Sequence, residues 1–304
     1  MMFIKTQFSI KDLENLSGVK AHTIRIWEKR YNLLEPARTD TNIRKYDLLN
    51  LKKLLNVTFL YNEGYKISKI AGFKEDEINK LIQGLAEKNK EDYALQAFKT
   101  SMFDFDHHLF TKTFNKLTQE KTFHEIFYDV FIPLLEEIGM LWQTGTIDPS
   151  HERFISELIK QKIILNISLI QDKKTKPQTP AFALFLPYEE IHEIGLLFAN
   201  YEIIYHGFNT VYLGTNIPIE SLKYILKHYD DITFLSYFTV KPDQESVYDY
   251  AKRFEREICA VKPMKLWLLG SKVQNVVPAK LPANVSIFLS LDQLRQKLDK
   301  LKLS

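Results

Sequence analysis

A dense group of basic residues near the start of the chain has the chemistry of a polyanion-binding surface. A helix over 20–31 would place Arg25 and Lys29, four residues apart, on one face, with Ile24 turned inward. Cationic side chains and tyrosine hydroxyls both donate hydrogen bonds to phosphate. A solvated basic face is the alternative explanation. The candidate DNA-contacting residues are Lys20, His22, Arg25, Lys29, Arg30, Arg38, Arg44, Lys45 and Tyr46.

A second candidate site follows a β-prone run, where the chain reads EIHEIG at 190–195. A neutral imidazole such as that of His192 ligates a transition metal through one nitrogen, while a carboxylate such as Glu190 accepts a bond from the other ring N–H. Gly195 permits close approach of a flat ligand. A lone histidine after a strand can equally be a helix-capping or surface residue, so both interpretations stay open.

Other reactive residues do not form a recognisable catalytic pattern. His151, Glu152 and Arg153 lack the second histidine of a zinc-protease helix. Cys259 has no evident activating neighbours. As the only cysteine, it excludes an internal disulfide framework and fits a reducing cytoplasm. The 10 glycines form no phosphate-cradling loop. The sequence predicts a protein that is not an enzyme.

Length and charge favour a multidomain nucleic-acid-binding protein. A chain of 304 residues is long for one core, so two or three domains are expected. Residues 1–75 hold 14 Lys and Arg against 8 Asp and Glu, whereas the remaining residues are slightly acidic. This distribution suggests a polyanion partner for the first part. Neither a signal peptide nor a membrane-spanning run is expected, which predicts a cytoplasmic protein without a membrane partner.

The elements that position the basic residues are predicted at 9–16 and 20–31, two short helices separated by Gly18. A polar hairpin follows Pro36, and Asp47 can cap a helix to about residue 63. These features predict a winged helix-turn-helix domain over 1–75. Residues 76–91 are charged and are predicted to be a linker, with a connecting helix as the alternative.

The rest of the chain divides into an α-helical and an α/β part. Helices at about 92–101, 104–118, 121–141 and 149–171 predict a four-helix bundle over 92–172. After a linker at 173–180, strands at 181–186, 210–213, 232–237, 265–269 and 285–289 alternate with helices at 191–206, 218–229, 243–258 and 291–302. This alternation predicts a Rossmann-like, doubly wound parallel sheet over 181–304, with ligands at the carboxyl ends of its strands. The fold class is therefore multidomain, α and α/β.

The N-terminal motifs resemble the MerR family of winged helix-turn-helix regulators. The resemblance covers about 7–73 and rests on SI at 9–10, GV at 18–19, TIRIWEKRY at 23–31, PART at 36–39, RKY at 44–46 and EGYKI at 63–67. The WEKRY version at 27–31 is similar to the branch of light-sensing repressors that bind cobalamin. The resemblance implies a dimeric protein that binds a pseudo-palindromic operator, with DNA contacts from Arg25, Arg30, Arg38, Arg44 and Tyr46.

The later part, about 92–295, resembles the cobalamin-binding module of that branch. EIHEIG resembles the signature Asp-x-His-x-x-Gly, SYF at 236–238 stands for Ser-x-Leu, and GS at 270–271 stands for Gly-Gly. VYLGTNIP at 211–218 resembles the second strand and its turn. The resemblance implies His192 as the cobalt ligand and a tryptophan that caps the cofactor. The implied cofactor-binding residues are Trp142, Glu152, Glu190, His192, Gly195, Ser236, Gly270 and Ser271.

The module also departs from its pattern. Glu190 is one methylene longer than aspartate, Ser271 is expected to crowd the nucleotide tail, and Phe238 replaces leucine. Arg153 replaces the histidine of a Glu-His pair. Gln143 replaces a histidine that takes the upper cobalt site in light-sensing members, which argues against photochemistry there.

Three functions follow from these residues. The first is a DNA-binding transcriptional regulator that senses adenosylcobalamin or a related corrinoid and thereby controls its assembly as a homodimer or homotetramer. The second is a ligand-free regulator whose degenerate module only mediates assembly or partner binding. The third is a corrinoid-dependent methyltransferase or mutase subunit, which the basic N-terminal part argues against.

Overall fold

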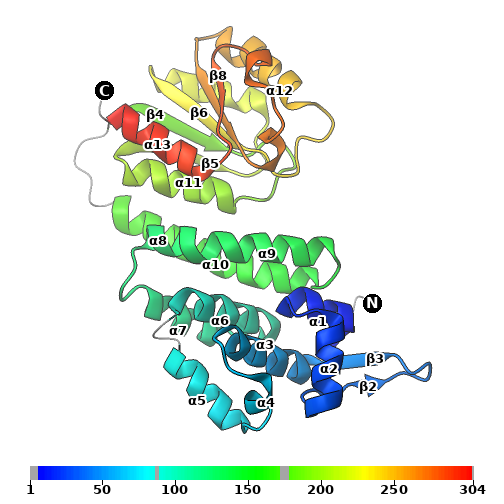
Figure 1. Ribbon diagram of the computed structural model, residues 1–304. Helices are drawn as coiled ribbons and strands as arrows, with labels where there is room; N and C mark the ends of the chain where they lie inside the picture. The colour runs from blue at the N-terminus through cyan, green and yellow to red at the C-terminus, as the bar shows by residue number, and fades with distance from the viewer. Residues whose placement is uncertain (1–5, 86–88, 172–177, 303–304) are drawn as a thin grey trace. The chain divides into compact units, whose positions relative to one another are not determined.

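The computed structural model describes residues 6–85, 89–171 and 178–302 (Figure 1). The chain forms two compact units, one ending at Ile159 and the other beginning at Lys160, and each is considered by itself. Within the described ranges, no helix combines the length and the apolar character needed to cross a membrane.

The N-terminal unit begins with the predicted winged helix-turn-helix. Helix α1 (Ile10–Ser17) starts at a capping box between Ser9 and Asp12 and ends at Gly18, whose φ of +72° suits glycine. Helix α2 (Ala21–Tyr31) follows. Strands β2 (Ala37–Arg38) and β3 (Arg44–Asp47) pair antiparallel as the wing. A short strand β1 (Gln7–Phe8) pairs with β3 on its other side and was not predicted, because two residues carry no periodicity.

Residues 76–91 are not simply a linker. Helix α3 (Leu48–Asn62) is capped by Asp47 as expected and is followed by the short helix α4 (Ile67–Ile70). Helix α5 (Glu75–Leu85) then buries Ile78 and Ile82 and packs against α3. The alternative prediction of a connecting helix therefore holds for residues 75–85. Residues 86–88 lie outside the described ranges.

The predicted bundle is present and has an aromatic core. Its helices are α6 (Lys90–Asp104), α7 (His107–Leu117), α8 (Phe123–Ile126), α9 (Ile132–Gln143) and α10 (Pro149–Gln171). A single π-helical turn, η1 (Phe127–Phe131), joins α8 to α9. The rings of Phe110 and Phe114 both stack on Phe131, with centroids 6.3 and 6.0 Å away.

The winged domain and the bundle were predicted as separate domains, but the winged domain and the part of the bundle up to Ile159 belong to one compact unit. Phe8 of β1 meets Phe103 of α6 edge to face at 5.8 Å. On α3, Asn56 accepts a 2.7 Å hydrogen bond from Gln96 of α6, and Phe59 contacts Tyr93. Helix α3 is thus shared by the winged domain and the bundle.

The C-terminal unit contains the predicted parallel sheet, with five strands in the order β5-β4-β6-β7-β8. The strands are β4 (Gln178–Phe185), β5 (Phe208–Gly214), β6 (Ile232–Tyr237), β7 (Lys265–Leu269) and β8 (Val285–Ile287). Strand β4 begins within the predicted linker 173–180. Residues 173–177 of that linker lie outside the described ranges.

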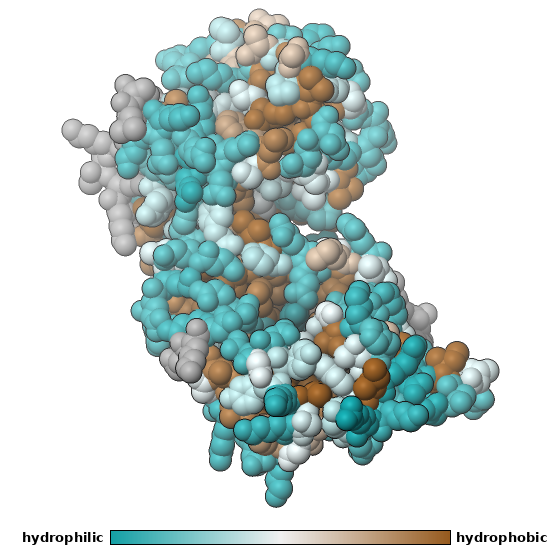
Figure 2. Space-filling model, viewed as in Figure 1, coloured by the Kyte–Doolittle hydropathy of each residue, from teal (hydrophilic) through white to brown (hydrophobic). Residues whose placement is uncertain are grey.

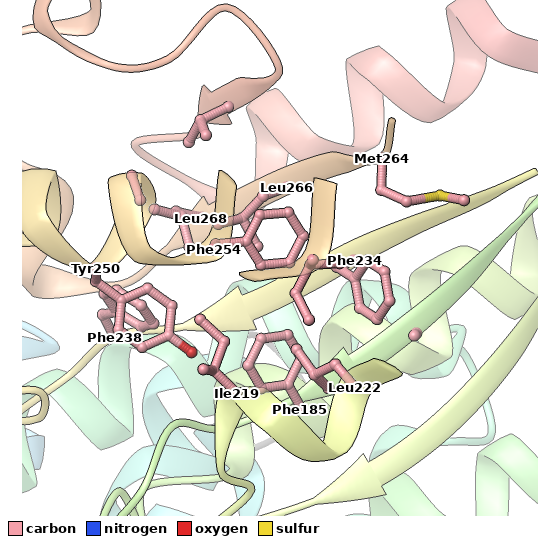
Figure 3. Packing of buried hydrophobic residues seen from close by; sticks show 14 of the residues in the cluster. Phe185, Ile219, Leu222, Phe234, Phe238, Tyr250, Phe254, Met264, Leu266 and Leu268 are labelled. Atoms are coloured by element: carbon pink, nitrogen blue, oxygen red, sulfur yellow. The ribbon is translucent and has the colours of Figure 1, made fainter. Parts of the chain in front are cut away.

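Helices cover both faces of this sheet. Helices α11 (Ile194–Tyr205) and α13 (Leu291–Lys302) pack together on one face. The other face is covered by η2 (Ile219–Lys227), α12 (Val247–Phe254) and η3 (Glu255–Cys259). Figure 3 shows Phe185, Phe234, Phe254, Leu266 and Leu268 packed together on that second face. Two single turns, η4 (Ser271–Val273) and η5 (Pro278–Lys280), follow β7. Helix α11 begins three residues later than predicted, so His192 lies in the loop before it.

Candidate functional sites

Helix α2 presents a basic face to solvent. Ile24 and Trp27 are buried, and Trp27 packs against Tyr61 of α3 with ring centroids 5.2 Å apart. The opposite side exposes the predicted DNA-contacting residues His22, Arg25, Lys29 and Arg30.

One apolar residue of this face, Ile26, was not predicted from the sequence to be part of the binding surface. Ile26 is 52% exposed between the cations, although isoleucine in an amphipathic helix usually indicates core. An apolar side chain beside basic ones suits contact with a thymine methyl group.

Glu28 ties the wing to α2. Its carboxylate accepts bonds from Arg44 Nε at 2.9 and 3.1 Å and from the Tyr46 hydroxyl at 2.9 Å. Tyr46 is fully buried, and burial together with its bond to Glu28 raises the pKa of Tyr46. The expected phosphate contact from Tyr46 is therefore wrong for this conformation, because its hydroxyl positions the wing instead.

The remaining predicted contacts lie on or near the wing surface. Arg38 is exposed and donates from Nη1 to Asn42 Oδ1 at 2.7 Å across the hairpin turn. Arg44 and Lys45 are partly buried, and Lys20 is exposed with its ammonium 3.5 Å from Glu14. Figure 2 shows the surface around the β2–β3 hairpin as largely hydrophilic, with small hydrophobic spots. DNA contact by these particular residues stays a prediction.

The bundle residues named from the sequence lie near the junction of α9 and α10. Trp142 is 48% exposed in the last turn of α9. Glu152 accepts a bond from Ser156 Oγ at 2.8 Å and lies 3.9 Å from Arg153. His151 is buried and stacks on Phe105, and this burial lowers the pKa of His151. The cofactor-capping roles of Trp142 and Glu152 stay predictions.

Glu190, in the loop after β4, accepts several hydrogen bonds through its carboxylate. It is fully buried, and its Oε1 accepts the backbone N–H groups of Ile191 and His192. Its Oε2 accepts three more, from Thr239, Val240 and Lys241, at 3.2, 2.7 and 2.8 Å. The extra methylene relative to aspartate lets one carboxylate connect this loop to the loop after β6.

These bonds determine the charge of Glu190. Burial alone would raise the pKa of Glu190, but the hydrogen bonds from the His192 ring and from the backbone N–H groups hold it well below its ordinary value. The carboxylate is therefore ionised at neutral pH.

His192 has the geometry of an oriented metal ligand. Its Nδ1 lies 2.6 Å from Glu190 Oε1, and its side chain is 51% exposed at the carboxyl edge of the sheet. A carboxylate on Nδ1 directs metal ligation to Nε2 and increases the basicity of that nitrogen. This part of the site fits a corrinoid cobalt.

The other predicted cofactor residues are occupied by the chain itself. A Cβ added to Gly195 would lie 2.5 Å from the ring of Tyr237, and one added to Gly270 would lie 2.2 Å from the carbonyl oxygen of Phe238. Ser236 Oγ donates to Phe185 O at 2.8 Å, and Ser271 Oγ donates to Thr239 O at 2.7 Å. The flat surface predicted at Gly195 is thus covered by a tyrosine ring. The cobalt-ligating part of the site fits the group, and the part around Gly195 does not.

The chain contains a winged helix-turn-helix with a basic face, a helical bundle, and a doubly wound domain with an oriented histidine. Together these parts define a DNA-binding regulator with a ligand-sensing module. Residues 8–77 match the MerR HTH family regulatory protein, and residues 94–165 match the B12 binding domain. The chain is a DNA-binding transcription regulator whose N-terminal part is similar to the MerR family and whose bundle is similar to a B12 binding domain.

The proteins similar to the chain include two curated repressors and a solved corrinoid protein. The HTH-type transcriptional repressor CarH of Myxococcus xanthus is 27% identical over 71% of this chain and 73% of its own length. The repressor CarA of the same organism is 26% identical over 86% and 87%. The Methanosarcina barkeri monomethylamine corrinoid protein is 12% identical with a TM-score of 0.58, covering 71% of this chain and all of that one. The last likeness shows the fold alone.

Proposed function

We propose that this regulator represses transcription from a pseudo-palindromic operator and that a corrinoid held by His192 controls its assembly. The two curated relatives are named as transcriptional repressors, which supports the direction of regulation. The proposed corrinoid is adenosylcobalamin or a related corrinoid, including forms that lack its nucleotide. The proposed assemblies are a homodimer and a homotetramer, and the proposed location is the cytoplasm, where DNA is the partner and Cys259 stays reduced.

The DNA-binding half of this proposal is supported by the outward face of α2. Lys29 and Arg25 are exposed, while the buried Ile24 and Trp27 fix the rotation of the helix about its axis. A phosphate contact from Lys29 is tested by the salt dependence of operator binding. Lys29→Ala should lower the slope of log affinity against log salt by about one. An unchanged slope would remove Lys29 from the interface.

The observation that carries the ligand half is the pair of Glu190 and His192. A buried carboxylate with five backbone donors is held in one place, and it orients the imidazole through Nδ1. When bound, the corrinoid would supply a cobalt ion for Nε2. Its binding can shift the assembly only through different affinities for the two oligomeric states.

The test is reconstitution of the full chain in the dark with hydroxocobalamin, adenosylcobalamin and diaquacobinamide, each followed by desalting and an absorption spectrum. We expect stoichiometric retention of at least one corrinoid and its loss in His192→Ala. Mass by light scattering and operator affinity, measured on the same samples, should change on loading. If none of the three is retained, corrinoid sensing is rejected.

A ligand-free regulator is the second candidate, and Tyr237 favours it. The ring of Tyr237 covers Gly195, where the cofactor resemblance requires open space. This candidate predicts that oligomer mass and operator affinity remain the same with every corrinoid. The reconstitution experiment therefore separates the two functions directly.

A further inference from the structure

The side chain of Tyr237 fills the space beside Gly195, where a flat ligand was expected. Tyr237 is the last residue of β6, a central strand whose backbone is fixed by pairing with β4 and β7. Its ring atoms Cζ, Cε1 and Cε2 lie 2.5, 2.7 and 2.8 Å from the position that a Cβ on Gly195 would take. The ring therefore packs directly on the backbone at the start of α11, and only the absence of a side chain at Gly195 allows this.

Two other predicted cofactor residues also make contacts within the chain. The Ser236 hydroxyl donates to Phe185 O, and Gly270 contacts the Phe238 carbonyl with a φ of +107°. Both contacts join neighbouring strands at the carboxyl edge of the sheet, so they belong to its folded core. A flat group entering here must displace Tyr237.

Corrinoids differ in whether they carry a second flat group, an aromatic base, in addition to the corrin ring. In cobalamin a nucleotide ends in an aromatic base on the lower face of the ring, and cobinamide lacks this nucleotide. When a protein histidine takes the lower position of cobalt, the base has to leave the metal and occupy protein space of its own. His192 remains oriented for the first role, while the ring of Tyr237 fills the space against Gly195 where a flat group is expected from the resemblance.

We propose that Tyr237 is a specificity-determining residue that excludes the nucleotide base, so that the chain selects corrinoids of the cobinamide type. The inference rests on the proposed corrinoid function and names its ligand class. The ring substitutes for the missing base against Gly195. The chain then binds the corrin through His192 without opening the domain between β6 and α11.

The experiment compares the dissociation constants of diaquacobinamide and hydroxocobalamin for the full chain and for Tyr237→Gly. Wild type should bind cobinamide more tightly by about tenfold to a hundredfold, the equivalent of burying one aromatic ring. Tyr237→Gly should remove this preference by improving cobalamin binding. Tyr237→Phe retains the ring and should behave as wild type. Nitrogen coupling in the cobalt(II) electron paramagnetic resonance spectrum of the wild-type cobinamide complex would confirm a protein nitrogen ligand, because cobinamide has no nucleotide base, and absence of this coupling would contradict the role of His192.

Equal affinity of wild type for the two corrinoids, or tighter binding of cobalamin, would overturn the role of Tyr237 while leaving corrinoid sensing intact. An unchanged preference in folded Tyr237→Gly would do the same. Binding of neither corrinoid by wild type would reject the proposed function as well. The wild-type ratio is decisive even if the glycine variant does not fold.

Discussion

Replacing Glu190 by glutamine would remove a negative charge that five backbone N–H groups and one imidazole share. The glutamine oxygen can serve only one of the two groups of donors. Its NH2 group would face the other group of donors. These donors are either those of Ile191 and His192 or the backbone N–H groups of Thr239, Val240 and Lys241. Three hydrogen bonds would be lost, and buried donors would be left without an acceptor.

The magnitude follows from these contacts. Hydrogen bonds to a buried charged group contribute roughly 1.5–3 kcal/mol each, and breaking such a network by removing one partner costs about 3–5 kcal/mol. We therefore expect Glu190→Gln to lower the free energy of unfolding of the C-terminal unit by about 3–5 kcal/mol at pH 7. Glu190→Asp keeps the charge but is one methylene shorter, so it should cost less, about 1–2 kcal/mol.

The effect should depend on pH in one direction. Hydrogen bonds lower the pKa of Glu190 in the folded state, so its charge stabilises the fold fully above the ordinary value of 4.5. This stabilisation is lost as the pH falls below 4.5 towards the lowered pKa of the folded state. The difference between wild type and Glu190→Gln should therefore be largest at neutral pH and shrink in acid.

Hydrogen exchange detected by mass spectrometry measures this directly, because the donors of Thr239, Val240 and Lys241 lie in one short segment. Protection factors for that segment, corrected for the intrinsic rate at each pH, convert to opening free energies. A loss of protection smaller than about tenfold in Glu190→Gln at pH 7, equivalent to about 1.4 kcal/mol, would refute the reasoning. A difference that grows in acid would also refute it.

Four further substitutions test other parts of the structure. Glu28→Ala strands the buried Tyr46 hydroxyl and releases Arg44, so urea unfolding of the N-terminal unit should show a loss of about 2–3 kcal/mol. Tyr46→Phe should cost about 1 kcal/mol, and additive losses in the double variant would contradict the proposed coupling. Gly270→Ala places a Cβ 2.2 Å from Phe238 O at a φ of +107°, so its Tm should fall by more than about 5 °C, whereas an unchanged Tm would disprove the clash. Arg25→Ala should relax base preference by about 1–3 kcal/mol in competition binding with mutated operators, and retained preference would exclude base contact.

Much of the fold was predictable because its signals are local. Ser9 caps α1, and strands β6 and β7 occupy the predicted residues, since short β-prone runs between helices have clear limits. Helix α5 was harder to predict, because its composition is charged. Ile78 and Ile82 are the buried residues of this helix, and with Leu81 and Leu85 they form an apolar stripe at helical spacing among the charged residues.

The site was less predictable because its contacts join residues distant in sequence. Tyr46 beside two basic residues suggested a surface contact, and only the fold brings it to Glu28, 18 residues earlier. Tyr237 occupies the variable position of a three-residue signature, so the motif itself gives no warning. Its effect depends on Gly195 of another element, and only the packing of α11 on β6 reveals it.

The shared helix α3 limits how this regulator can be engineered. Its Tyr61 supports Trp27 of α2, while its Asn56 and Phe59 contact α6. A hybrid regulator cut at residue 75 would carry the apolar rings of Phe8 and Phe59 without the helix that covers them. The transplantable unit is therefore the winged domain together with the first helices of the bundle, and a fusion made at the apparent domain boundary should give an aggregating protein.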